Sequence, residues 1–263
     1  QSFSKIFYNS AAQATLWLHQ MVSPVTGDGP NLGANDGALI LNLTDSSYRD
    51  YRPSVQLASN LFIGRRAYSK TGLWDLHLIW LGMTNDESDP IRYVNCDYDF
   101  GGYKILRSAD ANVIFRYPRF RYRPSQADAM HVDLWINGVN VLSDAGSYSY
   151  NSIPDMSGYF NGTASHNTVQ FDERDQMPKL GRFLFGSWLK SKHVFPISVS
   201  DAGLRCSASY RDYKGAEHLR HVHLNDTSLI VCDYVKGFKR KAIIRWRLSD
   251  NQWILENTLN GVC

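Results

Sequence analysis

The spacing of apolar residues changes from a helical to a two-residue period across the segment MTNDESDP, residues 83–90. Upstream of it, apolar side chains recur at helical intervals and predict three helices, over residues 10–22, 53–64 and 73–81. Downstream, short alternating runs follow one another without intervening helices, which is typical of antiparallel sheets. The segment itself is polar and ends in Pro, so it predicts a domain boundary. We therefore expect an α+β, mainly β chain, with helices in residues 1–84 and an antiparallel β-sandwich in residues 91–263.

Local signals place the ends of several elements. The first helix is expected to begin at an Asn9/Ser10 cap and to end before Ser23-Pro24. The dipeptide Asn137-Gly138 between two alternating runs predicts a hairpin of residues 131–136 and 139–144. Further strands are expected over residues 103–107, 113–117, 168–171, 219–224, 228–234 and 242–248.

A two-residue turn at Asn137-Gly138 would pair Ile136 with Val139 and bring His131 opposite Asp144. Asp133 and Asn140 would then share the same sheet face. Such groups are costly to bury unless they are paired or bind a ligand. The face is therefore either a satisfied polar pair or a site, and the sequence leaves both interpretations open.

Composition excludes several function classes. Lys and Arg number 28 against 25 Asp and Glu, and a net charge of +3 is too small to indicate nucleic-acid binding. No apolar run approaches the ~18 residues that span a bilayer. The four cysteines show no CxxC pair, so neither a zinc ribbon nor a disulfide framework is indicated. Aromatic residues make up 13% of the chain, which fits either a sugar-binding cleft or a large β core.

Three further patterns could carry chemistry. His166 enters a strand from a Gly-containing loop, in the run TASHNTV. Arg119, Arg121 and Arg123 would fall on one face of an extended segment, where they could hold carboxylates or protect an edge strand. His221 and His223 form an HxH pair, which is a weak metal signal and more typical of a solvated face.

Four segments together resemble the C-terminal half of heparinase II/III-like polysaccharide lyases. They are PNLGANDGALI (30–40), GGYKILRSAD (101–110), RPSQADAMHVDLWINGVNVLSDAGSYSYN (123–151) and YFNGTASHNTVQFDERDQ (159–176). The resemblance covers about residues 10–240. It implies the last helices of an α/α toroid followed by a β-sandwich, so we expect a fragment that lacks much of the toroid. The start at Gln1 without a Met fits a fragment or a processed chain.

The resemblance implies cleavage of uronate-containing acidic polysaccharide by β-elimination. The alternative is a non-catalytic protein that binds or assembles acidic polysaccharide and derives from the same fold. By resemblance, His166 and Tyr150 are expected to be catalytic, and Arg121, Arg123, Asn35 and Asp36 to bind substrate. A periplasmic or extracellular location is implied by the resemblance only, and the sequence leaves the oligomeric state open.

The resemblance also implies a metal site in the sandwich. Asp144 and His166 match two ligands of the family motif, whereas Gln126 stands where the first metal His is expected, and Pro124 where a catalytic His is expected. Gln is a poor substitute for imidazole at zinc. We therefore expect zinc or another divalent metal to be weakly bound or absent. In that case Asp144 and His166 would form a hydrogen-bonded pair, and His131 could serve as a replacement ligand.

Overall fold

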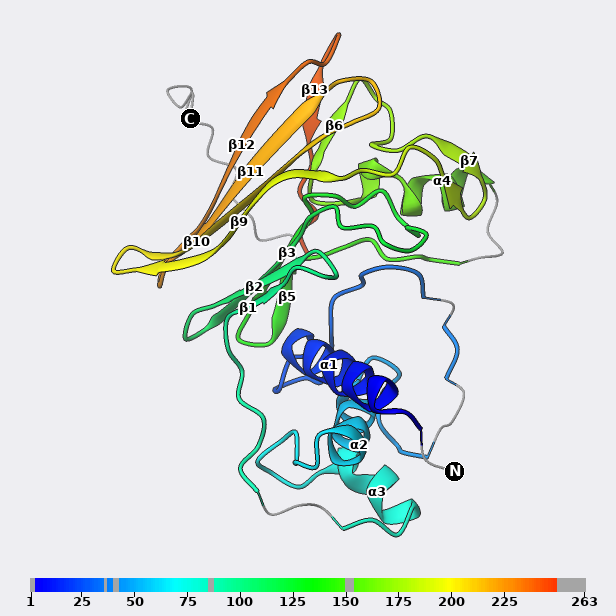
Figure 1. Cartoon of the computed structure of the whole chain (residues 1–263), viewed down its shortest axis with the longest axis vertical. Coiled ribbons are helices and arrows are strands. Elements are labelled where there is room, and N and C mark those ends of the chain that lie inside the picture. Colours follow the sequence, from blue (N-terminus) through cyan, green and yellow to red (C-terminus); the bar gives the residue numbers. More distant parts are fainter. Residues whose placement is uncertain (1–2, 36, 40–42, 85–87, 150–153, 250–263) are drawn as a thin grey trace. The chain divides into compact units, whose positions relative to one another are not determined.

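The structure, a computed structural model, describes residues 3–35, 37–39, 43–84, 88–149 and 154–249 (Figure 1). The chain divides into two compact units. The first comprises residues 1–30 and 37–94, and the second comprises residues 31–36 and 95–263. None of the helices in the described residues has the length and apolar character needed to cross a bilayer.

The first unit is built from helices at the three expected places. They are α1 (Lys5–Met21), α2 (Arg52–Phe62), the 3₁₀ turn η1 (Leu73–Asp75) and α3 (Leu76–Trp80). The expected start of α1 at Asn9/Ser10 is wrong, because the helix begins at Lys5. The Ser4 side chain accepts a hydrogen bond from the backbone N–H of Phe7 and caps the helix one turn earlier.

The second unit contains two larger antiparallel sheets. The first has the order β1-β2-β3-β4-β5, with strands Cys96–Tyr98, Tyr103–Arg107, Ala111–Arg116, Val132–Ile136 and Val139–Leu142. The second has the order β12-β11-β10-β9, with β9 Ser191–Ser200, β10 Gly203–Arg211, β11 Glu217–Leu224 and β12 Leu229–Lys236. The expected fold class, mainly antiparallel β with a few N-terminal helices, is confirmed.

Smaller elements connect the two sheets. Strand β6 (Val169–Phe171) pairs with β13 (Ala242–Ile244), and β7 (Lys179–Gly181) pairs with β8 (Leu184–Phe185). A helix, α4 (Pro154–Asn161), and a 3₁₀ turn, η2 (Thr163–Ser165), lie between β5 and β6. The sequence patterns did not predict α4, nor the strands β1, β7, β8, β9 and β10.

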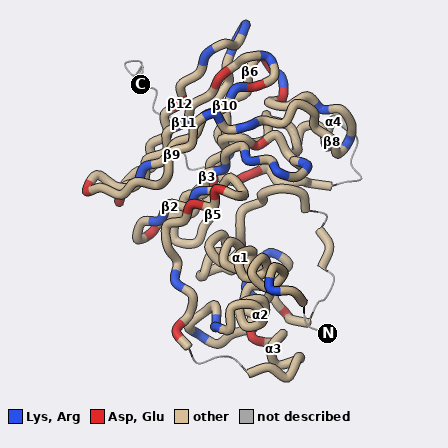
Figure 2. Tube along the Cα trace, in the orientation of Figure 1, with Lys and Arg blue, Asp and Glu red and all other residues tan. Residues whose placement is uncertain are grey.

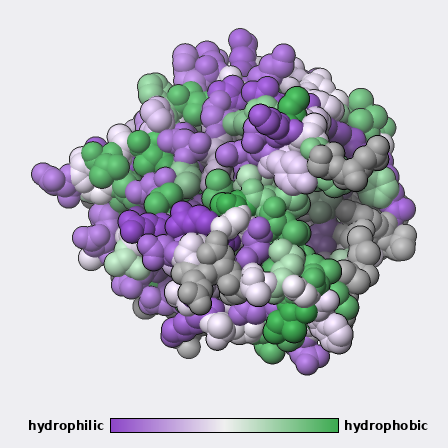
Figure 3. All heavy atoms as spheres, turned by 60° about the horizontal axis from the view of Figure 1, so that its bottom comes forward, coloured by the Kyte–Doolittle hydropathy of each residue, from purple (hydrophilic) through white to green (hydrophobic). Residues whose placement is uncertain are grey.

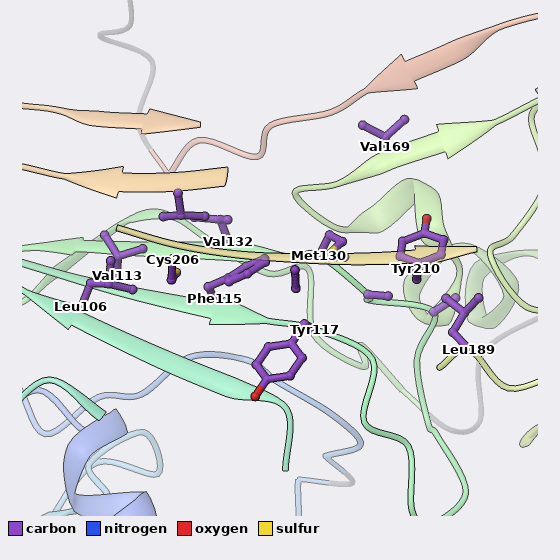
Figure 4. Close-up of a cluster of buried hydrophobic side chains, with 14 of the residues drawn as sticks. Leu106, Val113, Phe115, Tyr117, Met130, Val132, Val169, Leu189, Cys206 and Tyr210 are labelled. Carbon is purple, nitrogen blue, oxygen red and sulfur yellow. The ribbon is translucent and has the colours of Figure 1, made fainter. Parts of the chain in front are cut away.

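The inner faces of the two sheets share one hydrophobic core. Figure 4 shows Phe115 and Val132 of the first sheet gathered with Cys206 and Tyr210 of the second. Each of these side chains is at most 4% exposed. At about 25 cal/mol per Å² of apolar surface, this shared burial is the main force that fixes the sheets against each other. The loops at the sheet ends are thereby held in fixed positions.

The predicted hairpin forms, but its register changes along its length. Ile136 pairs with Val139 and Trp135 with Asn140, as expected from the two-residue turn. Leu134 then pairs with Leu142, so a β-bulge inserts one residue into β5. The Asn140 side-chain amide fills the bulge by donating to the carbonyl oxygens of residues 134 and 142, at 3.3 and 3.2 Å. The expected uninterrupted register is therefore wrong beyond Trp135.

Charged and apolar side chains are both distributed over the surface. Figure 2 shows Lys and Arg positions interspersed with Asp and Glu along the second unit. In Figure 3, exposed hydrophobic residues lie among hydrophilic ones on the face that is shown. A functional site is therefore better sought in specific clusters than in a general surface property.

A candidate metal centre and an arginine-lined pocket

Three segments of the second unit bring two histidines and one aspartate together. His131 directly precedes β4, Asp144 follows β5, and His166 lies between η2 and β6. All three side chains are at most 3% exposed. Their candidate ligand atoms lie within 4.8 Å of one another, so the group could hold a metal ion. We call these three residues the ligand cluster.

The ligand cluster is centred on the carboxylate of Asp144. The distance from its Oδ2 to His166 Nδ1 is 2.7 Å, a hydrogen bond, and to His131 Nδ1 it is 3.5 Å. Its Oδ1 accepts from the backbone N–H of Gly146 at 2.8 Å. Gly146 has a φ of +72°, a left-handed conformation that glycine adopts without steric cost. The Asp144 and His166 side chains are therefore joined by a hydrogen bond.

The electrostatics of the pair favour its charged form. Burial by itself raises the pKa of Asp144, but the charges of His166 and His131 and the hydrogen bonds outweigh burial and lower that pKa to about 2. Burial by itself lowers the pKa of His166, but attraction to Asp144 and their hydrogen bond raise it above its ordinary value. A metal ion would have to displace the proton of this hydrogen bond, because histidine binds a metal in its neutral form.

The side chains of the ligand cluster fit a divalent metal, but one of their nitrogen atoms already accepts a hydrogen bond. Two imidazoles and a carboxylate are a common zinc set that leaves one position open. Among the described residues, the buried Nε2 of His166 has no hydrogen-bond partner, and the buried Nε2 of His131 has none either but lies 3.6 Å from Asp133 Oδ2. Such orphaned polar atoms call for a ligand or solvent. However, the backbone N–H of Asn167 donates to His131 Nδ1 at 3.0 Å, so a metal bound at that nitrogen would displace this bond.

Asp133 lies on the other side of His131. Its Oδ2 is 3.6 Å from His131 Nε2, and its Oδ1 accepts from the Asn140 side chain at 2.6 Å. Burial raises the pKa of Asp133 above its ordinary value. His131 is therefore placed between two buried carboxylates, as the predicted hairpin face suggested, although the register differs.

Among the His, Cys, Asp and Glu side chains of the described residues, the group that could hold a metal contains Asp144 and His166 as predicted, and the expected role of Gln126 as a further ligand stays a prediction. Gln126 is buried, and its Oε1 accepts from the backbone N–H of Gly33 at 2.9 Å. His131 takes the third place beside Asp144 and His166, the role considered for it as a replacement ligand. The sequence did contain this signal, because the hairpin register already placed His131 near Asp144.

The other predicted site residues have varied positions. Asn35 is exposed, and its backbone N–H donates to the Ser147 hydroxyl at 3.0 Å. His166, predicted to be catalytic, is fully buried. Tyr150 and Asp36 lie outside the described residues.

A pocket of about 270 Å³ lies in the second unit and combines cationic, polar and apolar groups. Arg123 and Arg182 line it together with Phe183. Its polar lining also includes three hydroxyls and one amide, from Ser125, Ser147, Ser149 and Asn161. An anion with hydroxyl groups and an apolar face would find complementary partners here.

The expected row of three arginines on one extended face is wrong. Residues 118–125 form no strand; only Arg119 makes an isolated bridge, with Lys190. Arg119 pairs with Asp99 at 3.0 Å, Arg121 lies 4.2 Å over the Phe100 ring, and Arg123 lines the pocket. Pro118 and Pro124 interrupt the segment, since proline cannot donate to a sheet ladder.

The HxH pair forms no metal group with other residues in the described part of the chain. His221 lies on the exposed face against Tyr234, and the distance between His223 Nε2 and the carbonyl oxygen of Ala202 is 2.7 Å, a hydrogen bond. This agrees with the solvated-face interpretation.

Comparison with known proteins identifies the second unit. Residues 97–260 match the family model described as heparinase II/III-like, C-terminal. A heparinase III gene product with methylated lysines is similar in structure, with a TM-score of 0.70 at 15% identity over 97% of this chain and 36% of that chain. A mutant of the heparan sulfate lyase HepC from Pedobacter heparinus gives a TM-score of 0.65 at 14% identity, over 94% of this chain and 36% of its own.

A further heparinase III structure gives a TM-score of 0.56 at 17% identity, over 88% of this chain and 35% of that chain. The chain thus spans about a third of the length of the structures that it matches. No curated protein sequence matches it at a significant level.

Proposed function

The chain belongs to the heparinase II/III-like family, and we propose on that premise that it is the C-terminal part of a polysaccharide lyase. The proposed reaction is β-elimination on a uronate-containing acidic polysaccharide. The observation that carries the proposal is the pocket in which Arg123 and Arg182 lie beside Phe183 and several hydroxyls. A periplasmic or extracellular location fits such a substrate.

β-Elimination at a uronate requires three tasks. The C5 carboxylate is neutralised, a base removes the C5 proton, and an acid protonates O4 as the C4–O4 bond breaks and the C4–C5 double bond forms. Arg123 and Arg182 are suited to the first task, because a guanidinium binds a carboxylate through two parallel hydrogen bonds. Neutralising that carboxylate stabilises the negative charge that develops when the C5 proton leaves. Phe183 offers a flat surface for the apolar face of the sugar.

Proton transfer is assigned to groups outside the described pocket lining. The described residues that line the pocket are arginines, serines, an asparagine, an alanine and a phenylalanine, none of which is a base at neutral pH. Tyr150, next to Ser149 in the sequence, and the upstream helical region that the resemblance implies are the proposed sources of the base and acid.

The ligand cluster is assigned a structural role. Its three side chains are buried, so His166 acts on the segment that it anchors rather than on the sugar. His131, Asp144 and His166 would hold the metal, which when bound supplies a cross-link between three loop segments. The hydrogen bond from Asn167 to His131 Nδ1 and the Asp144–His166 pair both compete with the ion, so zinc or another divalent metal is expected to bind weakly.

Binding without cleavage is the second candidate function. It is favoured by Gln126 and Pro124, which occupy positions where the resemblance implies histidines, and by the commitment of the Gln126 side-chain oxygen to Gly33. In this case the arginine-lined pocket would still hold an acidic sugar, while the elimination step would be lost.

The two candidates are separated by assays on the chain and on its full-length protein. We expect the chain of residues 1–263 to bind uronate oligosaccharides and not neutral glucan oligosaccharides in calorimetric titrations. Arg123→Ala should weaken this binding about tenfold, whereas Arg121→Ala, which removes a guanidinium outside the pocket, should change it less. Unsaturated uronate ends from the full-length protein, detected by ultraviolet absorbance, would establish a lyase, and binding without them would favour the second candidate. Equal binding of neutral and acidic sugars would refute both.

A further inference from the structure

One buried arginine reaches the ligand cluster from the opposite sheet. Arg220 lies on β11, is 0% exposed, and directs its guanidinium between the sheets. Its Nη1 donates to two backbone carbonyl oxygens, those of Met130 at 2.5 Å and Asn167 at 2.7 Å. These residues directly precede His131 and directly follow His166. A single nitrogen atom thus ties together the backbone beside both histidines of the ligand cluster.

Of the two residues whose carbonyl oxygens bind Arg220, Met130 has a strained backbone conformation. Met130 has a φ of +65°, in the left-handed region that non-glycine residues seldom occupy. That conformation costs ~1–2 kcal/mol, so it persists only where the surroundings fix it. The charge-assisted hydrogen bond from Arg220 to the Met130 carbonyl oxygen stabilises this turn, together with the backbone hydrogen bond from His131 to Asp128. The turn aims His131 at Asp144.

The orientation of the guanidinium is fixed on its other edge. Nε and Nη2 donate to the two carboxylate oxygens of Asp233 on β12, at 2.6 and 2.8 Å. The guanidinium also lies over the Trp246 ring, 5.1 Å from its centroid. Because the guanidinium is planar, the two hydrogen bonds to Asp233 and the contact with the Trp246 ring direct Nη1 toward the carbonyl oxygens of Met130 and Asn167.

Asn167, which directly follows His166, links the backbone segments that carry the three residues of the ligand cluster. Its side-chain amide donates to the carbonyl oxygens of Val132 at 2.9 Å and Ser143 at 3.3 Å. These residues neighbour His131 and Asp144. Its backbone N–H holds His131 Nδ1, while its own carbonyl is held by Arg220. Every segment of the ligand cluster is therefore bonded to Asn167 or to Arg220.

We propose that Arg220 is a positioning residue that presets the ligand cluster by clamping the Met130 and Asn167 carbonyls. It touches none of the three ligand side chains and acts through the backbone beside them. The expected effect of Arg220 on metal binding rests on the proposed function. Its expected effect on the backbone beside His131 and His166 is independent of that function.

The test compares Arg220→Lys with Arg174→Lys in the chain of residues 1–263. Lysine keeps the charge toward Asp233 but cannot span Asp233 and two carbonyls at once. Arg174 is the control, because its Nη1 lies 2.6 Å from the buried carboxylate of Asp212 and the pair includes no residue of the ligand cluster, although the Arg174 side chain is 18% exposed. Amide hydrogen exchange by NMR is measured on the metal-free protein, and Co²⁺ binding is followed by visible absorption.

In Arg220→Lys we expect the Asn167 amide to exchange about tenfold faster relative to the hydrogen-bonded amides of β2 and β3, with no such selective change in Arg174→Lys. Co²⁺ affinity should fall ~10–100-fold with altered absorption bands, as for other groups that orient metal ligands. Unchanged relative exchange at Asn167 would overturn the proposal whatever the metal result. A wild-type chain that takes up no Co²⁺ would instead refute the metal site of the proposed function. The exchange comparison would then still test whether Arg220 positions the backbone beside His131 and His166.

Discussion

The ion pair between Arg220 and Asp233 gives the most informative stability prediction. Asp233→Asn keeps the shape of the side chain but removes the charge that faces a fully buried guanidinium. Breaking a buried pair by removing one partner costs about 3–5 kcal/mol, because the remaining charge stays uncompensated. Asparagine retains one acceptor oxygen, so we expect a loss of about 3 kcal/mol in the free energy of unfolding.

Urea unfolding at pH 7, followed by tryptophan fluorescence, measures this loss, and Trp246 beside Arg220 provides a local probe. Asp201→Asn is the control, because this exposed carboxylate lies in the turn between β9 and β10. Such surface changes cost less than about 0.5 kcal/mol. A loss below about 1 kcal/mol for Asp233→Asn would refute the view that the pair anchors Arg220.

The same pair predicts a pH dependence with a defined sign. Burial by itself raises the pKa of Asp233, but hydrogen bonds from His218 and Arg220 and their charges outweigh it and lower that pKa well below the ordinary 3.8. A depressed carboxyl pKa contributes stability above pH 3.8 that is lost as pH falls toward the folded-state value. The gap between wild type and Asp233→Asn should therefore narrow below about pH 4. A gap of constant size from pH 7 to pH 3 would contradict this reasoning.

His218 adds a second acid-sensitive contribution. Burial lowers its pKa below the ordinary 6.5, since the neutral ring is favoured inside the core. The unfolded chain therefore binds the proton more readily, and wild-type stability should decrease as pH falls below 6.5.

The remaining predictions concern the proposed function. Gln126→His should raise zinc occupancy measured by elemental analysis, and no gain would mean that position 126 does not lie beside Asp144 and His166. The chain of residues 1–263 alone should release no unsaturated uronate, and robust turnover would refute the assignment of proton-transfer groups upstream. Binding of uronate oligosaccharides should weaken as salt rises, because exposed charge contacts are screened over ~10 Å at 0.1 M. Arg182→Ala should reduce that salt dependence, and an unchanged salt dependence would exclude its guanidinium from the contact.

Local sequence signals predicted the features that depend on neighbouring residues. Asn137-Gly138 specified a tight turn because both positions adopt positive φ, as the structure shows with +49° and +81°. Helix α2 formed at its predicted place because Pro53 and the apolar spacing act within the helix itself. The motifs around Asp144 and His166 likewise identified two members of the ligand cluster.

Some helices and strands were not predicted because their sequence patterns are weak. Strand β9 is an edge strand with Pro196, and most of its side chains are not buried, so it lacks clear alternation. Helix α4 is short and carries Gly158, which hides its helical pattern.

Only the tertiary structure decided how the residues of the ligand cluster are held in place. His131 lies beside Asp144 and His166 although a bulge in β5 breaks the expected register, and Met130, directly before it, has a left-handed conformation that no sequence pattern predicted. The backbone acceptors of Arg220 are 53 and 90 positions away from it in the sequence. Sequence periodicity reports which side of an element is buried, but it carries no information on which distant backbone atoms a buried charge will meet. Those partners are selected by the packing of the two sheets, which determines where a buried guanidinium finds its acceptors.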